Sequence, residues 1–296
     1  MKLRRLLPAV LLLRGAVHGA DLRDANAIIF SDITSDGGHS EGGIIVGGDW
    51  NGTHYEIRQH SESAKVQGAG LVLKGDNLTS TGLRIFDGDA IYGGSGGTFD
   101  MENGAVLEQS VDMTANETAA ADSLAYFRSL TGTPIDTSDL NNVRPDLDDA
   151  PVQNGFHVFT LAASEVTGNR TLDFSNADAD DVIVINLTGD NLDWNWSSNF
   201  NPRQLLWTYQ GSLFTINSRE FVGSLLAPGA SVIQNQNING TVIANTLQIQ
   251  NSVELHNFTF LSPIGEIPSV PEPAAALLTV LAGALLAGRR RETGRP

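Results

Sequence analysis

Short apolar runs, each closed by Gly, Asn or Asp, are the feature that most limits what this chain can fold into. They lie at residues 43–47, 71–73, 83–86, 182–185, 224–227 and 242–244. Runs of this length that end in turn-forming residues are typical of buried strands. Gly-Asp pairs occur at 48–49, 75–76, 88–89 and 189–190, and they suit chain reversals because Gly tolerates positive φ and Asp bonds to nearby backbone. We therefore predict a mainly β chain with many tight turns.

One stretch of the sequence repeats itself. Residues 223–228 recur in pattern at 240–245, an offset of 17 residues, and a further strand pattern follows at 246–250. One coil of a β-solenoid requires a repeat of about this length, because stacked coils bury a common apolar interior. Asn235, Asn237 and Asn239 lie between the two copies and could form Asn ladders at a corner. We predict a right-handed β-helix-like solenoid, and a β-sandwich is the alternative.

Residues 105–130 have a different pattern. Leu107, Val111, Leu124, Phe127 and Leu130 recur at roughly helical spacing among Ala, Glu and Asp, with Gly and Pro as stops just beyond. We predict one or two accessory helices here, packed on the β-body. Residues 131–155 are polar and acidic and contain three prolines, which predicts a loop.

Residues 1–20 have the three parts of a secretory signal peptide. Lys2, Arg4 and Arg5 form a basic start, residues 6–13 form an apolar run too short to span a bilayer, and small residues follow. We predict export, with an uncleaved anchor as the alternative. The chain has no cysteine, which excludes disulfides, thiolate metal sites and cysteine nucleophiles.

The last residues, 266–296, form a separate tail. A short polar motif precedes an apolar stretch at 274–288 and a basic end follows it; these are Val270, Pro271, Glu272 and Pro273, then Arg289, Arg290 and Arg291. The apolar stretch is marginal for a transmembrane helix, and the arginines should stay cytoplasmic. The three parts, in this order, resemble the PEP-CTERM sorting signal. That resemblance implies a Gram-negative setting and processing by an exosortase-type enzyme. It also implies a transient inner-membrane anchor through this tail alone; a plain tail anchor is the alternative.

The body of the chain, residues 21–265, resembles the choice-of-anchor A family. The resemblance rests on residues 41–49, 182–189, 205–207, 221–230, 239–244 and 254–257 and on Phe260. It implies an adhesive domain of the ice-binding-like β-solenoid type, carried on varied surface anchors, with no catalytic residues to transfer.

The charge of the chain limits its partners. The formal net charge is −16, although the two ends hold eight of the 18 basic residues, so the body is more acidic still. Such a body repels nucleic acid and anionic membranes. It suits divalent cations, basic partners or simply solubility.

Three groups of residues are candidate sites. Trp194 and Trp196 are spaced to share one face of a strand, where they could be core, a lid or candidate ligand contacts for sugar rings. His256 and Glu254 could face the same side of a strand, but two ligands do not complete a metal site, and the family resemblance favours a buried strand end. His39 and Glu41 lie in a Gly-rich stretch and are a weaker candidate pair. Two carboxylate clusters, Asp146 with Asp148 and Asp149, and Asp178 with Asp180 and Asp181, could bind calcium or be solvated loops.

These patterns favour a binding protein over an enzyme. The sequence has no nucleophile elbow, P-loop or dinucleotide fingerprint. We assign no catalytic, cofactor or metal residues, and we predict a non-enzymatic cell-surface or matrix protein that adheres to exopolysaccharide or other surface material. Ice is a less favoured ligand, because no regular Thr-x-Thr array is found. A polysaccharide-modifying enzyme and a structural surface-layer component are the alternatives.

Overall fold

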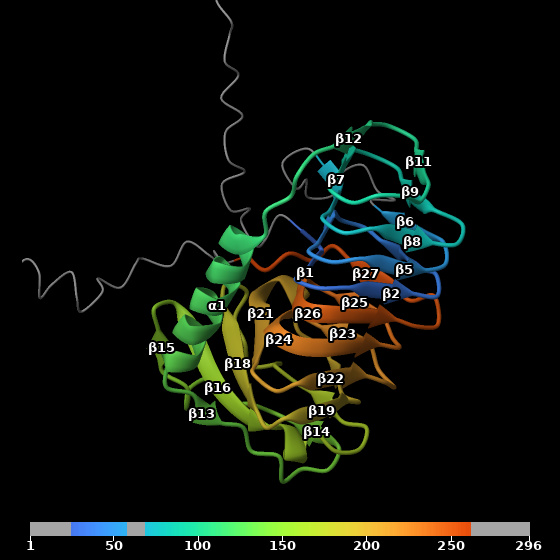
Figure 1. The fold of residues 1–296 in the computed structure, drawn as a ribbon. Helices are drawn as coiled ribbons and strands as arrows, with labels where there is room; N and C mark the ends of the chain where they lie inside the picture. The colour runs from blue at the N-terminus through green and yellow to red at the C-terminus, as the bar shows by residue number, and fades with distance from the viewer. Residues whose placement is uncertain (1–24, 58–68, 262–296) are drawn as a thin grey trace, which may run out of the picture. The chain divides into compact units, whose positions relative to one another are not determined.

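The strands of the described chain are stacked side by side, almost all of them parallel. The computed structural model describes residues 25–57 and 69–261, and Figure 1 shows their strands as successive coils of one stack. Within these residues, only β15 (Val152–Gln153) pairs antiparallel, with β16 (Phe156–Ala162). Parallel strands need crossover connections, which the turns of each coil provide. The predicted β-solenoid is confirmed, and the β-sandwich alternative is wrong.

The strands fall on three faces, which we name here. The helix face contains β1 (Ala27–Ile29), β4 (Ile44–Val46), β7 (Ala69–Leu73), β10 (Asp89–Tyr92), β12 (Val106–Glu108), β13 (Thr133–Pro134), β16, β18 (Ile183–Thr188), β21 (Leu205–Tyr209) and the first halves of β24 (Ser224–Gln234) and β26 (Val242–Ile249). The open face contains β2 (Ile33–Ser35), β5 (Trp50–Gly52), β8 (Asn77–Thr79), β19 (Asn191–Trp194), β22 (Leu213–Ile216) and the second halves of β24 and β26. The polar face contains β3 (His39–Ser40), β6 (Tyr55–Ile57), β9 (Leu83–Ile85), β11 (Phe99–Met101), β23 (Phe221–Val222), β25 (Ile238–Asn239) and β27 (Glu254–His256). A small separate sheet contains β14 (Asn142–Val143), β17 (Thr171–Leu172) and β20 (Ser197–Ser198).

The described chain begins in the middle of the stack. From β1 it winds coil by coil to β12, and α1 (Thr114–Ser129) then carries it back past the starting level to β13 and β16 at the other end. From there it returns coil by coil to β26, which pairs with β1 in the register Ala27↔Val242. The first and last described coils are therefore neighbours, as the adjoining blue and orange strands of Figure 1 show. We call the contact between these two coils the seam.

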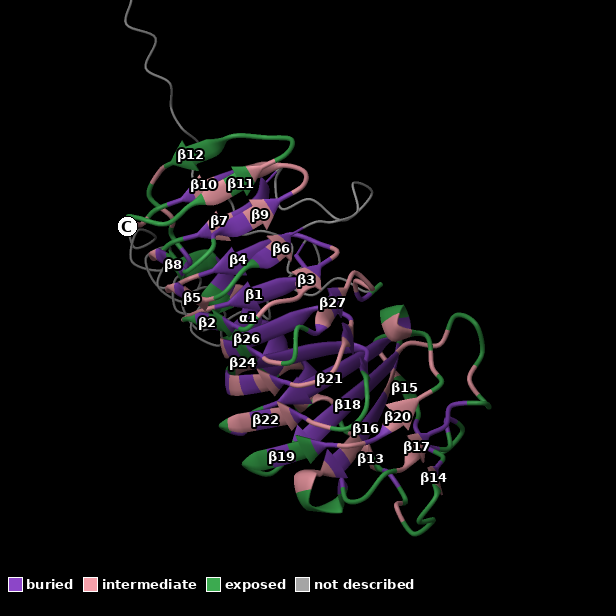
Figure 2. Cartoon of the chain, turned by 90° about the vertical axis from the view of Figure 1, so that its right-hand side faces the viewer, coloured by how far each residue is buried: buried purple, intermediate pink, exposed green. Residues whose placement is uncertain are grey.

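Two apolar layers hold the coils. Inward side chains form the larger core, which includes the fully buried Trp50 and Trp207. Outward side chains of the helix face form a second layer, in which Ile28 and Ile243 lie in one cluster with Phe127 of α1. Where both layers cover it, as at β1, β18, β21 and β26, the helix face is buried on both sides, which explains why these strands are apolar runs in the sequence. Figure 2 shows buried strands through the whole stack, with exposed residues at β12 and β19 near its ends.

The Gly-Asp pairs stand at corners where neighbouring coils are bonded together. Asp49 N donates to Asp32 Oδ1 at 2.8 Å, and Asp76 N donates to Asp49 Oδ1 at 2.7 Å. A Cβ on Gly48 would lie 2.2 Å from Asp32 Oδ1, and one on Gly75 would lie 2.3 Å from Asp49 Oδ1. Neither glycine has positive φ. At these two corners glycine is therefore required because a side chain would not fit, and not because the backbone has the positive φ that we predicted.

The accessory helix is shorter than predicted. Helix α1 covers only the second part of residues 105–130, and the prediction of helix from residue 105 is wrong because Leu107 lies in the strand β12. Leu107 pairs with Ile91 of β10 and continues the outward apolar stripe of the helix face. Leu124 and Phe127 lie on the buried side of α1, as predicted.

The repeated segments lie directly on each other, as predicted. β24 and β26 pair in the register Leu225↔Val242 to Ala227↔Ala244. One of the three predicted Asn residues forms a ladder contact between coils: Asn235 Nδ2 donates to Asn217 Oδ1 at 3.1 Å. A ladder needs one residue from each coil, so Asn residues two apart in a single turn cannot stack on one another.

The predicted signal peptide and sorting tail lie outside the described residues. The tail residues are Val270, Pro271, Glu272, Pro273, Arg289, Arg290 and Arg291, within a second unit of the chain, Glu266–Pro296. In the part of the chain that the structure describes, no helix is long and apolar enough to cross a membrane.

Candidate functional site: the open sheet face

The open face presents an unbroken grid of outward side chains. The strand registers join a central column across seven strands, in the order Asp193, Thr215, Ile233, Gln248, Thr34, Asn51 and Leu78. Neighbouring strands in a sheet lie about 4.8 Å apart, so the members of this column recur at that spacing. The inward residues between them, such as Phe214 and Trp50, are fully buried and fix the strands in place.

The grid consists of amides, hydroxyls and aliphatic groups, with carboxylates toward its edges. Thr34 and Gln248 are exposed, and Leu78 is 51% exposed. The strands of the open face contain no Lys or Arg. Amides and hydroxyls both donate and accept hydrogen bonds, so the grid can bind a ligand with many hydroxyl groups. A row of such groups along successive strands suits an extended ligand, whereas small molecules bind in concave pockets.

Hydrogen bonds between coils hold the edges of this face. On one edge, Asn235 bonds to Asn217, whose Nδ2 donates to Asp193 Oδ1 at 3.2 Å. On the other edge, Asp32 and Asp49 accept the backbone N–H groups described above. Side chains that are already fixed lose less freedom when a ligand binds. The open face is therefore preorganised along both edges.

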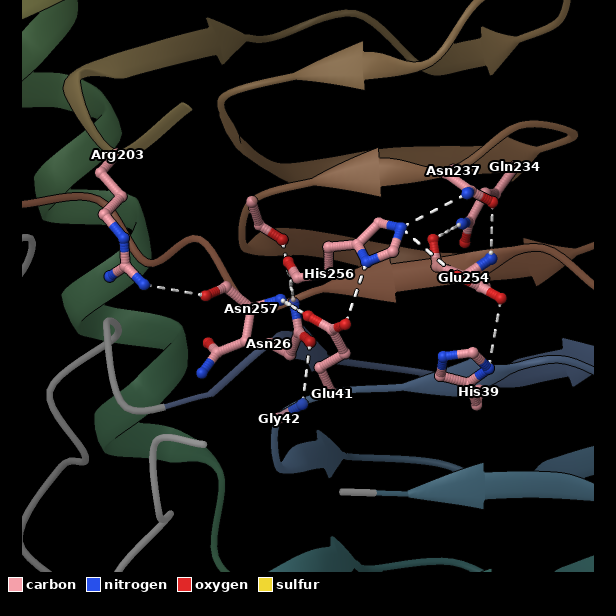
Figure 3. Close-up of polar contacts among 11 residues, drawn as sticks. Asn26, His39, Glu41, Gly42, Arg203, Gln234, Asn237, Glu254, His256 and Asn257 are labelled. Carbon is pink, nitrogen blue, oxygen red and sulfur yellow. Dashed lines mark hydrogen bonds and ion pairs between the residues drawn. The ribbon is translucent and has the colours of Figure 1, made fainter. Parts of the chain in front are cut away.

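A second polar cluster lies on the polar face, at the seam (Figure 3). His256 Nδ1 lies 3.2 Å from Glu41 Oε1, and His256 Nε2 lies 3.4 Å from Glu254 Oε2. The other oxygen of Glu254 lies 3.5 Å from His39 Nδ1. The contacts of His256 with Glu41 and of Glu254 with His39 each join the last described coil to the first. This cluster therefore ties the two ends of the β-body together.

The structure brings the predicted His and Glu pairs into one cluster. Glu254 and His256 share one side of β27, as predicted, but the expected burial of this strand end is wrong, because only Leu255 points inward. Behind the cluster, burial raises the pKa of the Tyr55 hydroxyl, and the charge of Glu254 raises it further. Among the described residues, no group of three or more His, Asp or Glu is arranged to hold a metal ion.

Asn26 completes the seam from inside. Its Nδ2 donates to Gly240 O at 3.0 Å and to His256 O at 3.2 Å, and its Oδ1 accepts from Gly42 N at 3.0 Å. Its side chain thus bonds to the coil on each side of its own, and Figure 3 shows it between them. Asn26 is fully buried. Nothing in the local sequence singled this residue out, because its partners are more than 200 residues away, except for Gly42.

Trp194 and Trp196 belong to the core. Their exposed fractions are 1% and 0%, and the Trp194 ring packs edge-on against Trp207 and Phe221 at centroid distances of 4.7 and 5.2 Å. The two rings do share one side, with centroids 5.9 Å apart, but that side is the interior. Neither ring offers a surface to a sugar, which corrects their assignment as candidate ligand contacts.

The two carboxylate clusters form turns. Asp146 Oδ1 accepts from Asp148 N at 3.0 Å, and Asp181 Oδ2 accepts from Asp178 N at 2.7 Å. Asp181 also lies 3.3 Å from His157 Nε2. These contacts support the interpretation as structured, solvated loops, while calcium binding stays an untested prediction.

The fold and its open face define a β-solenoid of the surface-binding class. The family scan agrees, because residues 19–257 match the family described as "Putative Ice-binding-like adhesive domain". The match covers most of the chain, and the protein therefore belongs to this family of adhesive domains. Family and fold together establish a surface-binding protein in general terms and leave the ligand open.

Comparisons with individual proteins do not identify the ligand. A search of the curated proteins finds no match. Among solved structures, one similar chain is the crystal structure of an ice binding protein from an Antarctic bacterium, Flavobacteriaceae. It is 12% identical, with a TM-score of 0.32, and the alignment covers 81% of this chain and 82% of that one. A similarity of this size does not bear on the ligand.

Proposed function

We propose that this protein is an exported, non-enzymatic adhesive protein that binds extended polysaccharide through its open face. The observation that carries the proposal is the central column from Asp193 to Leu78, which offers either a hydrogen-bonding or an aliphatic side chain at each of its seven strands. Polysaccharides present the same two kinds of group, hydroxyls and C–H surfaces, along an extended chain.

The length of the face supports adhesion over the capture of a small sugar. One contact of this kind contributes little, because exchange with water offsets most of a hydrogen bond. An extended ligand that lies across several coils makes many contacts at once, and each contact after the first forms at high effective concentration. Weak contacts in a row therefore add up to firm attachment.

The tail forms part of the proposal. We infer a signal peptide at residues 1–20 and a PEP-CTERM-type tail with its motif at Val270–Pro273 and its basic stop at Arg289–Arg291, processed by an exosortase-type enzyme. Choice-of-anchor A is the finer family assignment that we propose on the same grounds. At the described ends of the body, Ala25 and Phe260 pack in the apolar layer of the helix face.

Binding to the extracellular polysaccharide of the producing cells tests the proposal. We design a variant with the polar groups of the central column removed: Thr34→Val, Asn51→Leu and Gln248→Leu. The control makes the same three chemical changes elsewhere, at Thr118, Asn169 and Gln109. We expect at least tenfold weaker retention of the first variant and no change in the control, because three hydrogen bonds at about 0.5–1.5 kcal/mol each are lost.

Two results would contradict the proposal. One is equal retention of the two variants, which would move the binding site off the open face. The other is failure of the wild-type protein to bind polysaccharide, combined with inhibition of ice growth or with ordered self-assembly at high concentration. These would point to ice or to a structural surface layer.

A further inference from the structure

One edge of the open face carries a row of carboxylates, one from each of three successive coils. Asp32, Asp49 and Asp76 each come directly before a strand of the open face, two residues ahead of Thr34, Asn51 and Leu78 of the central column. Each accepts a backbone N–H of the next coil through Oδ1, at 2.8, 2.7 and 2.6 Å, the last from Ser95. The row therefore repeats at the strand spacing of about 4.8 Å and is fixed in position.

These carboxylates can still accept donors from outside. The backbone bonds use one oxygen of each group, and a carboxylate has about four acceptor positions. Asp32 is exposed, and Asp49 and Asp76 are half-buried. Lys74, the nearest basic residue in the sequence, interacts electrostatically with Asp112, just before α1. The strands of the open face supply no cation of their own.

The centre of the face beside this row is apolar at one end. Leu78 is 51% exposed, and it follows Asp76, which directly precedes the same strand, by two residues. The surface that a ligand meets is therefore an aliphatic and amide strip with a line of negative charge along one edge. The complementary ligand is a polymer with a C–H surface and with positive charges that recur along one side.

We propose that the polysaccharide bound by the open face is a cationic amino polysaccharide, and this rests on the proposed polysaccharide binding. Its ammonium groups lie along Asp32, Asp49 and Asp76, while its sugar rings lie over Thr34, Asn51 and Leu78. Repulsion between fixed like charges in the empty row adds to the attraction for such a ligand. Anionic polysaccharides are repelled from the same edge.

Three polymers and two variants test this. The polymers are chitosan, the same chitosan after full N-acetylation, which keeps the backbone and removes the charge, and alginate, which is anionic. The first variant is Asp32→Asn, Asp49→Asn and Asp76→Asn, which keeps the Oδ1 acceptors of the corner bonds. The control is Asp136→Asn, Asp139→Asn and Asp146→Asn, which changes the net charge equally at carboxylates that also accept backbone N–H groups.

We expect the wild-type protein to bind chitosan about tenfold more tightly than the acetylated polymer, since three ion pairs act together. The first variant should lose this preference and the control should keep it. The inference about charge is overturned if both variants lose the preference for chitosan equally, or if the wild-type protein prefers the acetylated polymer. Either result leaves the proposed polysaccharide binding intact. Failure of the wild-type protein to bind any of the three polymers overturns the charge inference, and it would sink the proposed function only if the producer's own polysaccharide were not retained either.

Discussion

Replacement of Asn26 by alanine tests whether the β-body depends on the seam between its first and last coils. The side chain makes three hydrogen bonds, with Gly240 O, His256 O and Gly42 N, at 3.0 to 3.2 Å. A neutral hydrogen bond contributes about 1 kcal/mol to stability, and a buried group left without a partner costs about 1–3 kcal/mol. Gly42 N–H would be such a group, because Gly42 is buried. We therefore expect Asn26→Ala to lower the free energy of unfolding by about 3 kcal/mol.

The related change Asn26→Asp separates packing from hydrogen bonding. Aspartate has nearly the same shape and keeps an acceptor for Gly42 N–H, but it loses the two N–H donors. Its charge would face the carbonyl oxygens of Gly240 and His256, and a buried charge without a partner is costly. We expect Asn26→Asp to be at least as destabilising as Asn26→Ala at neutral pH. If Asn26 mattered only for its shape, Asn26→Asp would have almost no effect on stability.

Urea unfolding of the purified protein, followed by tryptophan fluorescence, measures both changes. Asn51→Ala is the matched control, because Asn51 lies on the open face and is half-exposed; we expect a change of at most about 0.5 kcal/mol there. Hydrogen exchange should show faster exchange in β1 and β26 than in β18 when the seam weakens. An Asn26→Ala protein within about 0.5 kcal/mol of wild type, with unchanged exchange at β1, would refute the reasoning.

Three further predictions follow from single positions. Gly48→Ala should destabilise the fold by about 1–3 kcal/mol, because its Cβ would meet a carboxylate oxygen at 2.2 Å, whereas Gly229→Ala should stay within about 0.5 kcal/mol, because nothing lies within 4 Å; thermal unfolding compares them. Trp207→Phe should cost about 1 kcal/mol more than Trp194→Phe in urea unfolding, because Trp207 Nε1 donates to a carbonyl at 2.9 Å, while among the described residues the Trp194 N–H has no acceptor. Burial, and then a nearby carboxylate, raise the pKa of Tyr209 to about 12. The folded state therefore resists its ionisation, so stability should be complete below pH 10 and should fall between about pH 10 and 12. Tyr209→Phe should flatten this fall, and an equally steep profile in that variant would argue against it.

The local elements of the fold could be predicted from the sequence because their cause is local. Parts of the helix face are buried on both sides, so residues such as 182–185 and 242–244 are apolar throughout and stand out. The 17-residue offset predicted the stacking of Leu225 on Val242, which are one coil apart. The start of α1 could not be predicted, because Leu107 fits a helical spacing while it continues an outward stripe of strands.

The candidate site could not be predicted, because its neighbours are not neighbours in the sequence. Thr34 and Gln248 are ordinary polar residues in their own strands, and nothing in either segment indicates that they pair. Trp194 and Trp196 attracted attention because large aromatic residues are conspicuous. Their alternation was correctly predicted, but alternation alone does not say which side of a strand faces the core.

The seam and the open face depend on each other. The central column is continuous only because Gln248 pairs with Thr34. These two residues are neighbours only because the last described coil packs against the first. On one side of the seam, the column from Asp193 to Gln248 is uncharged except at Asp193. On the other side, the column from Thr34 to Leu78 runs beside the row of Asp32, Asp49 and Asp76. A weakened seam would divide a long binding face into two short ones, and the loss of shared contacts would exceed the sum of the separate losses. Variants at Asn26 that still fold should therefore adhere more weakly, although Asn26 is buried and touches no ligand.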